Sequence, residues 1–196
     1  IIESFNDKRI VVHNNGKNLG QTKSLNIGIR LAKGKYIARM DADDMAYPQW
    51  LEMLLGYAES HQEHVAVSAA AAVMDESGSI RKVLRTPTTF EEVIFHIFFG
   101  NAINHVGAIF NREVILGIGG YNDEFKITQD YELWSLLIRN NYKLINVEDI
   151  LVAVRVHGSS IGYIEEKKKG LDEVAETIYR NVTALTNLKI SYEDAV

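Results

Sequence analysis

The chain has 196 residues, which is long enough for one domain with a sizeable buried core. Its 26 acidic and 21 basic residues give a net charge of −5, which argues against nucleic acid as a partner because phosphate backbones favour clustered Lys and Arg. The absence of cysteine excludes disulfides, thiolate–zinc sites and cysteine nucleophiles. No apolar run approaches the roughly 18 residues of a membrane span, and a cytoplasmic location is the default expectation.

The first quarter of the chain predicts strands that alternate with helices. Ile10–Val12 is predicted as a short strand, and apolar residues then recur at helical spacing from Gln21 to Gly34, which is placed to end the helix. Tyr36–Ala38 is predicted as a second strand, and a further helix is expected to begin near Pro48. A strand, a helix and a strand at this spacing are typical of a parallel βαβ unit.

The rest of the chain adds strands that need not be parallel. Val65–Ala70 has the composition of a buried strand, and Ile80–Leu84 is expected to return from a turn as a hairpin. Further helices are predicted at Phe90–Phe99, Arg112–Leu116, Asp130–Asn140 and Glu165–Leu188, and further strands at Val106–Phe110, Leu144–Val147 and Leu151–Val156. The fold class is therefore α/β, with a mixed sheet.

Three carboxylates, Asp41, Asp43 and Asp44, closely follow the predicted strand Tyr36–Ala38. The carboxyl ends of strands are where open α/β sheets bind ligands. Three carboxylates in four residues repel one another unless a cation or hydrogen-bond donors compensate, and Mg²⁺ or Mn²⁺ commonly joins one or two carboxylates to substrate phosphates. The cluster indicates a metal-assisted diphosphate site; the alternative is that Asp43 and Asp44 cap the next helix.

Six short motifs follow one another in a fixed order: Asn18–Gly20, Leu25–Ile29, Ala32–Asp44, Gly119–Tyr121, Gln129–Trp134 and Arg155–His157. As an ordered set, they resemble family 2 glycosyltransferases, which have the GT-A fold and an Asp-x-Asp motif. The resemblance implies a three-layer α/β/α fold around a mixed central sheet. It also implies a catalytic domain over residues 1–160 and a helical tail over residues 161–196 that packs on it.

The resemblance assigns roles to individual residues. The metal ligands for Mn²⁺ or Mg²⁺ would be Asp43, Asp44 and His157, and the donor-binding residues would be Asp41, Asp43, Asn26, Lys23 and Arg155. Asp130 matches the family's catalytic base, and its position at the start of a helix suits a carboxylate. From the residues alone, an N-cap is the favoured interpretation of Asp130, and the alternative for His157 is a surface loop.

Several positions depart from the family pattern or carry little signal. Leu25 stands where an arginine is common, and Gln129 replaces the usual acid before the base, so Asp130 should ionise more easily. His105, Asn101 and Asn104 lie in a region that resembles the acceptor side, but isolated residues of these types are more often structural.

The start of the chain also departs from the family pattern, because the strand–helix–strand segment that binds the nucleotide base in the family has no counterpart here. We therefore expect an N-terminally truncated piece of the catalytic domain. Such a piece would expose an unpaired edge of the sheet, and a homodimer through that edge would cover it.

The function implied is inverting, metal-dependent transfer of a sugar from a nucleotide-sugar, with a UDP-sugar expected first, to an acceptor hydroxyl in bacterial polysaccharide or glycoconjugate synthesis. The acceptor would be a saccharide or a lipid-linked molecule at the inner face of the membrane. One alternative is a nucleotidyltransferase, which should have a glycine-rich basic loop near its start. Another is a non-catalytic carbohydrate- or nucleotide-binding domain that binds metal and donor without transfer.

Overall fold

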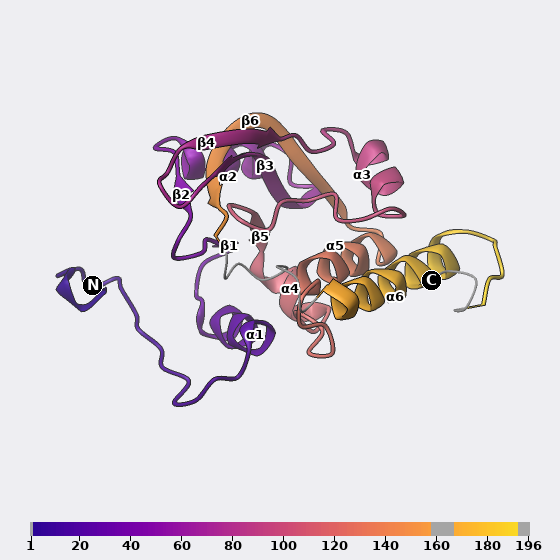
Figure 1. The fold of residues 1–196 in the computed structure, drawn as a ribbon, viewed down its shortest axis with the longest axis horizontal. Helices are drawn as coiled ribbons and strands as arrows, with labels where there is room; N and C mark the ends of the chain where they lie inside the picture. Colours follow the sequence, from indigo (N-terminus) through magenta and orange to yellow (C-terminus); the bar gives the residue numbers. More distant parts are fainter. Residues whose placement is uncertain (1, 158–166, 192–196) are drawn as a thin grey trace.

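The computed structural model describes residues 2–157 and 167–191 (Figure 1). The helices are η1 (Ile2–Ser4, a 3-10 turn), α1 (Gln21–Leu31), α2 (Trp50–Ser60), α3 (Phe90–His96), α4 (Arg112–Gly117), α5 (Gln129–Arg139) and α6 (Lys167–Leu185). The strands are β1 (Tyr36–Ala38), β2 (Met45–Ala46), β3 (His64–Met74), β4 (Ile80–Leu84), β5 (Ile109–Asn111) and β6 (Lys143–Arg155). None of the helices in these ranges combines the length and apolar character that crossing a bilayer requires.

One mixed sheet organises the structure. Its strand order is β1-β5-β3-β6-β2, and β4 forms a hairpin with β3 outside this path. The central pair β3–β6 is parallel, whereas every other pair is antiparallel. The two long central strands curve together through the upper half of Figure 1. The predicted mixed α/β sheet is therefore confirmed.

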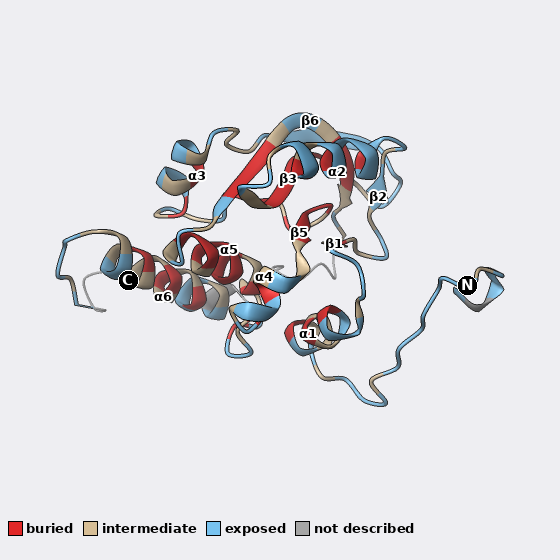
Figure 2. Cartoon of the chain, turned by 180° about the vertical axis from the view of Figure 1, so that it is seen from behind, coloured by how far each residue is buried: buried red, intermediate tan, exposed pale blue. Residues whose placement is uncertain are grey.

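The sheet separates two apolar layers, because successive side chains of a strand point to opposite faces. On β3, Ala66 packs with α3, α4 and α5, whereas the next residue, Val67, packs with α2. Phe110 and Ile109 on β5 divide in the same way. Trp134 of α5 is fully buried on the first face, and Figure 2 shows buried residues on β3, β5 and α5. The result is an α/β/α arrangement of layers.

The predicted strand at Ile10–Val12 is wrong. These residues form no strand, their side chains are exposed, and Figure 1 shows the N-terminal segment running away from the sheet. Among the described residues β1 pairs only with β5, and that pairing is antiparallel, so the predicted parallel βαβ unit is also absent. β-branched residues favour a strand only where a neighbouring strand supplies hydrogen bonds and packing.

Three element boundaries differ for local reasons. The first helix ends with Ala32 as its C-cap, two residues before Gly34. Strand β5 begins at Ile109 because Gly107 turns the chain with φ 79°. The two strands predicted over 144–156 form one strand, β6, whose register against β3 shifts where Glu148 and Asp149 are inserted. The polar pair marks a β-bulge rather than a loop.

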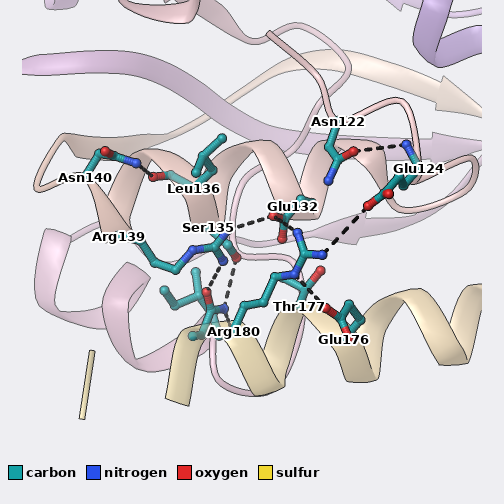
Figure 3. Close-up of polar contacts among 12 residues, drawn as sticks. Asn122, Glu124, Glu132, Ser135, Leu136, Arg139, Asn140, Glu176, Thr177 and Arg180 are labelled. Atoms are coloured by element: carbon teal, nitrogen blue, oxygen red, sulfur yellow. Dashed lines mark hydrogen bonds and ion pairs between the residues drawn. The ribbon is translucent and has the colours of Figure 1, made fainter. Parts of the chain in front are cut away.

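The C-terminal helix α6 lies beside α5 in both ribbon views (Figures 1 and 2). Polar side chains join the two helices: buried Glu132 of α5 accepts hydrogen bonds from Arg139 of the same helix at 2.7 Å and from Arg180 of α6 at 3.0 Å (Figure 3). Asn181 bonds Arg139 and Ser135. The helix was predicted from Glu165; it is described from Lys167, and the two residues before it lie outside the described ranges.

Candidate active site

The acidic cluster follows β1 at the edge of the sheet. Backbone hydrogen bonds continue the ladder as far as Arg39, whose N–H donates to Ala108 at 2.9 Å. The buried guanidinium of Arg39 donates to both carboxylate oxygens of Asp41 at 2.6 Å. Carboxylate oxygens of Asp41, Asp43 and Asp44 lie within 4.8 Å of one another. The segment therefore gathers three acids, of which Asp41 already has a cationic partner.

The end of β6 meets this cluster because β2 pairs with β6 in a register that places Met45 opposite Ala153. The backbone N–H of Arg155 donates to Asp44 Oδ1 at 2.7 Å, and its guanidinium donates to the Asp43 carbonyl at 3.0 Å. His157 Nε2 lies 3.0 Å from Asp43 Oδ2. The hydrogen bond from His157 lowers the pKa of Asp43, whereas burial raises the pKa of Asp44.

The donor set suits a hard divalent cation. Carboxylate oxygens are the ligands that Mg²⁺ and Mn²⁺ prefer, and imidazole nitrogen is compatible with Mn²⁺. The alternative that Asp43 and Asp44 cap the next helix is wrong, because the N-cap of α2 is Gln49. The acids are therefore left for a partner other than the helix.

Asp130 is the second residue of α5 and is half-buried. The N-cap of this helix is Thr128, so the alternative of Asp130 as an N-cap is wrong. Asn101 Nδ2 donates to Asp130 Oδ2 at 2.7 Å. Burial raises the pKa of Asp130 and outweighs the opposing effects of Arg39 and Asn101. The expectation that this carboxyl ionises easily because Gln129 is neutral is therefore corrected by its desolvation.

A single cavity of about 430 Å³ joins the acidic cluster to Asp130. Its walls contain most of the site residues predicted from the sequence, namely Asp41, Asp43, Asp44, Asp130, Arg155 and His157. Arg39, Gln21, His105, Ile127 and Gln129 contribute further to the lining. Residues from α1, the segment after β1, α5 and the end of β6, which are distant in the sequence, thus face one space.

Two predicted donor-binding residues are not brought into this cavity. Asn26 is buried in α1, where its amide donates to the Tyr121 carbonyl at 2.8 Å and accepts from the Tyr121 N–H at 2.9 Å. A Cβ on Gly120 would approach Asn26 Oδ1 to 2.5 Å, so a glycine is needed for this contact. Lys23 is exposed and does not line the cavity. Asn26 therefore anchors a loop in this structure.

Other residues of the site gave only weak signals in the sequence. Arg39 could have been noticed as a cation directly before an acidic run, and its contact with Asp41 reduces the repulsion within the cluster. Asn101 gave no usable signal, because its contact with Asp130 spans 29 positions. His105 Nε2 lies 2.6 Å from the Tyr121 hydroxyl, and burial lowers the pKa of His105 well below its ordinary value, which favours the neutral ring.

A mixed α/β sheet with an acidic cluster and a facing carboxylate defines a GT-A-like glycosyltransferase domain. The model of the family described as glycosyl transferase family 2 matches residues 1–119, and the chain belongs to that family. Membership in this family of sugar transferases excludes the nucleotidyltransferase alternative. The matched range contains the acidic cluster, whereas α5 with Asp130 lies beyond it.

Individual relatives agree with this assignment. An uncharacterized glycosyltransferase of Haemophilus influenzae is 31% identical over 191 residues, which cover 92% of this chain and 58% of the relative. The amylovoran biosynthesis glycosyltransferase AmsE of Erwinia amylovora is 30% identical over 171 residues, covering 86% of this chain and 62% of that protein. The chain thus spans about 60% of the length of these two curated relatives.

Solved structures support the fold. Residues 1–349 of S. aureus TarS, in a crystal structure with UDP-GlcNAc, match with a TM-score of 0.60 at 13% sequence identity. The match covers 90% of this chain and 50% of the TarS chain. At this identity the similarity establishes the GT-A-like fold of the chain, which agrees with the predicted architecture.

Proposed function

We propose that the protein transfers a sugar from a nucleoside diphosphate to an acceptor hydroxyl with inversion at the anomeric carbon. The observation that carries the proposal is the cavity of about 430 Å³, whose lining contains both the acidic cluster and Asp130. Such a space can hold a diphosphate near the acids and an acceptor oxygen near Asp130. The acidic cluster would thus serve the departing diphosphate, and Asp130 would serve the attacking acceptor oxygen.

On the donor side, Asp43, Asp44 and His157 would hold Mn²⁺ or Mg²⁺, with Asp43 as the principal ligand. Its pKa is lowered and its side chain is exposed, so it is ionised and accessible at neutral pH. When bound, the cation would neutralise charge on the departing diphosphate. Asp41 would contribute less, because Arg39 already occupies both of its oxygens.

Arg155 has a narrower part in this proposal than direct donor binding. Its guanidinium donates to the carbonyls of Asp43, Asp75 and Glu76, each at 3.0 Å, and its N–H holds Asp44. The side chain therefore fixes the loop that carries Asp43 and Asp44 against the end of β6. Its positive charge also favours anion binding in the cavity.

On the acceptor side, Asp130 would remove the proton from the hydroxyl whose oxygen attacks the anomeric carbon. The new bond between the acceptor oxygen and the sugar forms as the bond to the diphosphate oxygen breaks. Asn101 donates a hydrogen bond to Oδ2 of Asp130 and so helps to fix the orientation of the carboxylate. A carboxyl whose pKa is raised by burial is a stronger base than an exposed one, and a base is most effective when its pKa is near the working pH.

The donor and acceptor classes rest on similar proteins. A UDP-sugar is the first donor to test, because the similar TarS structure contains UDP-GlcNAc. Polysaccharide or glycoconjugate synthesis, with a saccharide or lipid-linked acceptor, is supported by the relative named for amylovoran biosynthesis.

A homodimer through the outer edge of β1 is also proposed, because β1 pairs only with β5 among the described residues and has an unpaired side. Light scattering of the purified protein tests this proposal. A monodisperse monomer would contradict it.

The first experiment measures sugar transfer and donor binding in full-length variants. We expect Asp130→Asn to lower turnover by about 10²- to 10⁴-fold while Mn²⁺-dependent UDP binding persists. Asp43→Asn should abolish that binding in calorimetric titrations. Asp149→Asn, at an exposed position on the β6 bulge, is the matched control. Unchanged turnover in both site variants would refute the proposal, and metal-dependent binding without any transfer would favour the non-catalytic alternative.

A further inference from the structure

Helix α5, which carries Asp130, lacks a side-chain cap of its own. Its N-cap residue Thr128 makes no capping hydrogen bond to the helix. By contrast, α3 begins with a complete capping box formed by Thr89 and Glu92, and α4 begins with Asn111 accepting two backbone N–H groups. An unsatisfied helix start is costly, since a missing cap typically destabilises a helix by about 1 kcal/mol.

A carboxylate of α6 instead binds the backbone that leads into α5, as far as its N-cap residue Thr128. Glu173 Oε1 accepts the N–H of Lys126 at 2.8 Å, and Oε2 accepts the N–H groups of Ile127 at 2.9 Å and Thr128 at 2.8 Å. The hydroxyl of Thr128 also lies 3.2 Å from Oε2. Glu173 is 9% exposed, so these charge-assisted bonds are shielded from water. Its negative charge lies at the positive end of the α5 dipole.

The same loop is fixed from the other side by α1. The Thr22 hydroxyl donates a hydrogen bond to the Phe125 carbonyl at 2.7 Å, and the Asn26 side chain bonds the backbone of Tyr121. Two helices thus hold the loop that leads into α5: α1, which precedes it in the sequence, and α6, which follows it. Ile127, within this loop, and Asp130, just beyond it, line the cavity.

We propose that Glu173 is a positioning residue for Asp130. Its carboxylate fixes the backbone of residues 126–128, and this backbone sets where α5 begins and where the Asp130 carboxylate lies. The inference rests on the proposed function, in which Asp130 is the base. It assigns to α6 a part in the reaction although the helix contributes no lining residue to the cavity.

A matched control lies on the same helix. Glu176 accepts the Arg180 Nε–H at 2.7 Å and makes no hydrogen bond to the loop before α5 (Figure 3). Replacing Glu173 or Glu176 by Gln removes one negative charge from α6 in either case. Only the first replacement disturbs the three N–H groups of residues 126–128.

The test compares Glu173→Gln and Glu176→Gln in the full-length protein by amide hydrogen exchange and steady-state kinetics. In Glu173→Gln we expect exchange at residues 126–131 to accelerate about tenfold or more and kcat to fall about tenfold. The KM for the donor should change less than about twofold, because the donor is proposed to bind at the acidic cluster. Glu176→Gln should match the parent protein in all three measurements.

Other outcomes separate the two proposals. Parental exchange and parental kcat in Glu173→Gln, or equal effects in both variants, would overturn the positioning role. Full turnover in Asp130→Asn would refute the proposed base. The exchange comparison would still test whether Glu173 fixes the backbone of residues 126–128. Should Glu173→Gln fail to fold, Thr128→Val removes only the hydroxyl contact with Glu173. A smaller fall in kcat with faster local exchange is then expected, and unchanged values would contradict the inference.

Discussion

Two charged clusters in the molecule differ in how far their carboxylates are already paired. At the end of β1, three carboxylates gather near Arg39, Arg155 and His157, and Asp43 stays exposed. Between α5 and α6, the carboxylate of Glu132, which is 2% exposed, lies between Arg139 and Arg180, and Arg180 also pairs with Glu176 (Figure 3). The first cluster leaves carboxylate oxygens available to a ligand, whereas the second uses its charges to join two helices. Both are rich in charge, but only the open one has the features of a binding site.

The largest expected effect is on the free energy of unfolding, which should depend on Glu132 far more than on Asp43. Glu132→Gln should lower the free energy of unfolding by about 3 kcal/mol, because it removes the buried anion that pairs with both Arg139 and Arg180. Asp43→Asn should change it by less than about 0.5 kcal/mol, since this side chain is exposed. Urea denaturation of both variants measures the difference. Similar losses in the two variants would contradict this division of roles.

Stabilisation by bound metal should depend on the acidic cluster and not on the cluster around Glu132. At a Mn²⁺ concentration of about one hundred times its dissociation constant, the parent protein should gain about 2.7 kcal/mol of stability. Glu132→Gln should keep this gain from a lower starting melting temperature, whereas Asp43→Asn should lose it. Thermal melts with Mn²⁺ and then with excess chelator test the prediction. A gain that persists in Asp43→Asn would place the metal elsewhere.

The Asp130 side of the cavity should respond to pH through Asn101. Burial raises the pKa of Asp130, and the Asn101 hydrogen bond partly opposes this by stabilising the ionised form. Arg39 acts in the same direction as Asn101, and His105 across the cavity is neutral because its own pKa is lowered. A base is active when ionised, so activity should fall as pH drops through the raised pKa. Asn101→Ala should move this acidic limb to higher pH.

The control for this pH profile is Asn140→Ala, at the opposite end of α5, where the amide bonds only the Leu136 carbonyl. Its profile of kcat/KM against pH should coincide with that of the parent protein. A limb that stays in place in Asn101→Ala, or moves to lower pH, would mean that Asn101 does not stabilise the carboxylate. Stability has the opposite sign for this group: a raised folded-state pKa means that stability decreases as pH rises through the window above its ordinary value.

Sequence reasoning located the features that are local. The acids of Asp41–Asp44 and the helix containing Asp130 stand out in short windows, and the structure brings them to one cavity. Their catalytic roles stay predictions. The mixed sheet was also predictable, because a hairpin at Ile80–Leu84 and a buried run before it are visible in the pattern.

Features set by tertiary partners were not predictable. Glu173 lies 45 positions from Thr128, and nothing in its neighbourhood marks it among the exposed acids of an amphipathic helix. Ile10–Val12 has the composition of a strand but no strand beside it. The polar pair Glu148–Asp149 suggested a break between two strands. In the structure the pair forms a bulge within β6, because pairing with β3 continues on both sides of it. In each case the deciding interaction comes from a segment that a local pattern does not contain.

The smallest expected effect concerns Asp75, an acid in the turn between β3 and β4. The hydrogen bonds of this carboxyl outweigh the effect of its partial burial on its pKa. Hydrogen bonds from Ser77 and Ser79, together with the ion pair to Arg81, lower the pKa of Asp75 to about 2. A depressed folded-state pKa adds stability above the ordinary value of 3.8, and this is lost as pH falls from 3.8 toward about 2.

The parent protein should therefore lose slightly more stability across that pH window than Asp75→Asn, which has no carboxyl to titrate there. Denaturation curves at closely spaced pH values measure the difference, and Asp149→Asn on the β6 bulge is the exposed control. Parallel curves for the parent and Asp75→Asn would mean that the turn's hydrogen bonds are equally available to the unfolded chain. Asp43 would then be the better example of a carboxylate held by its partners, because its contact with His157 spans 114 positions and requires the folded sheet.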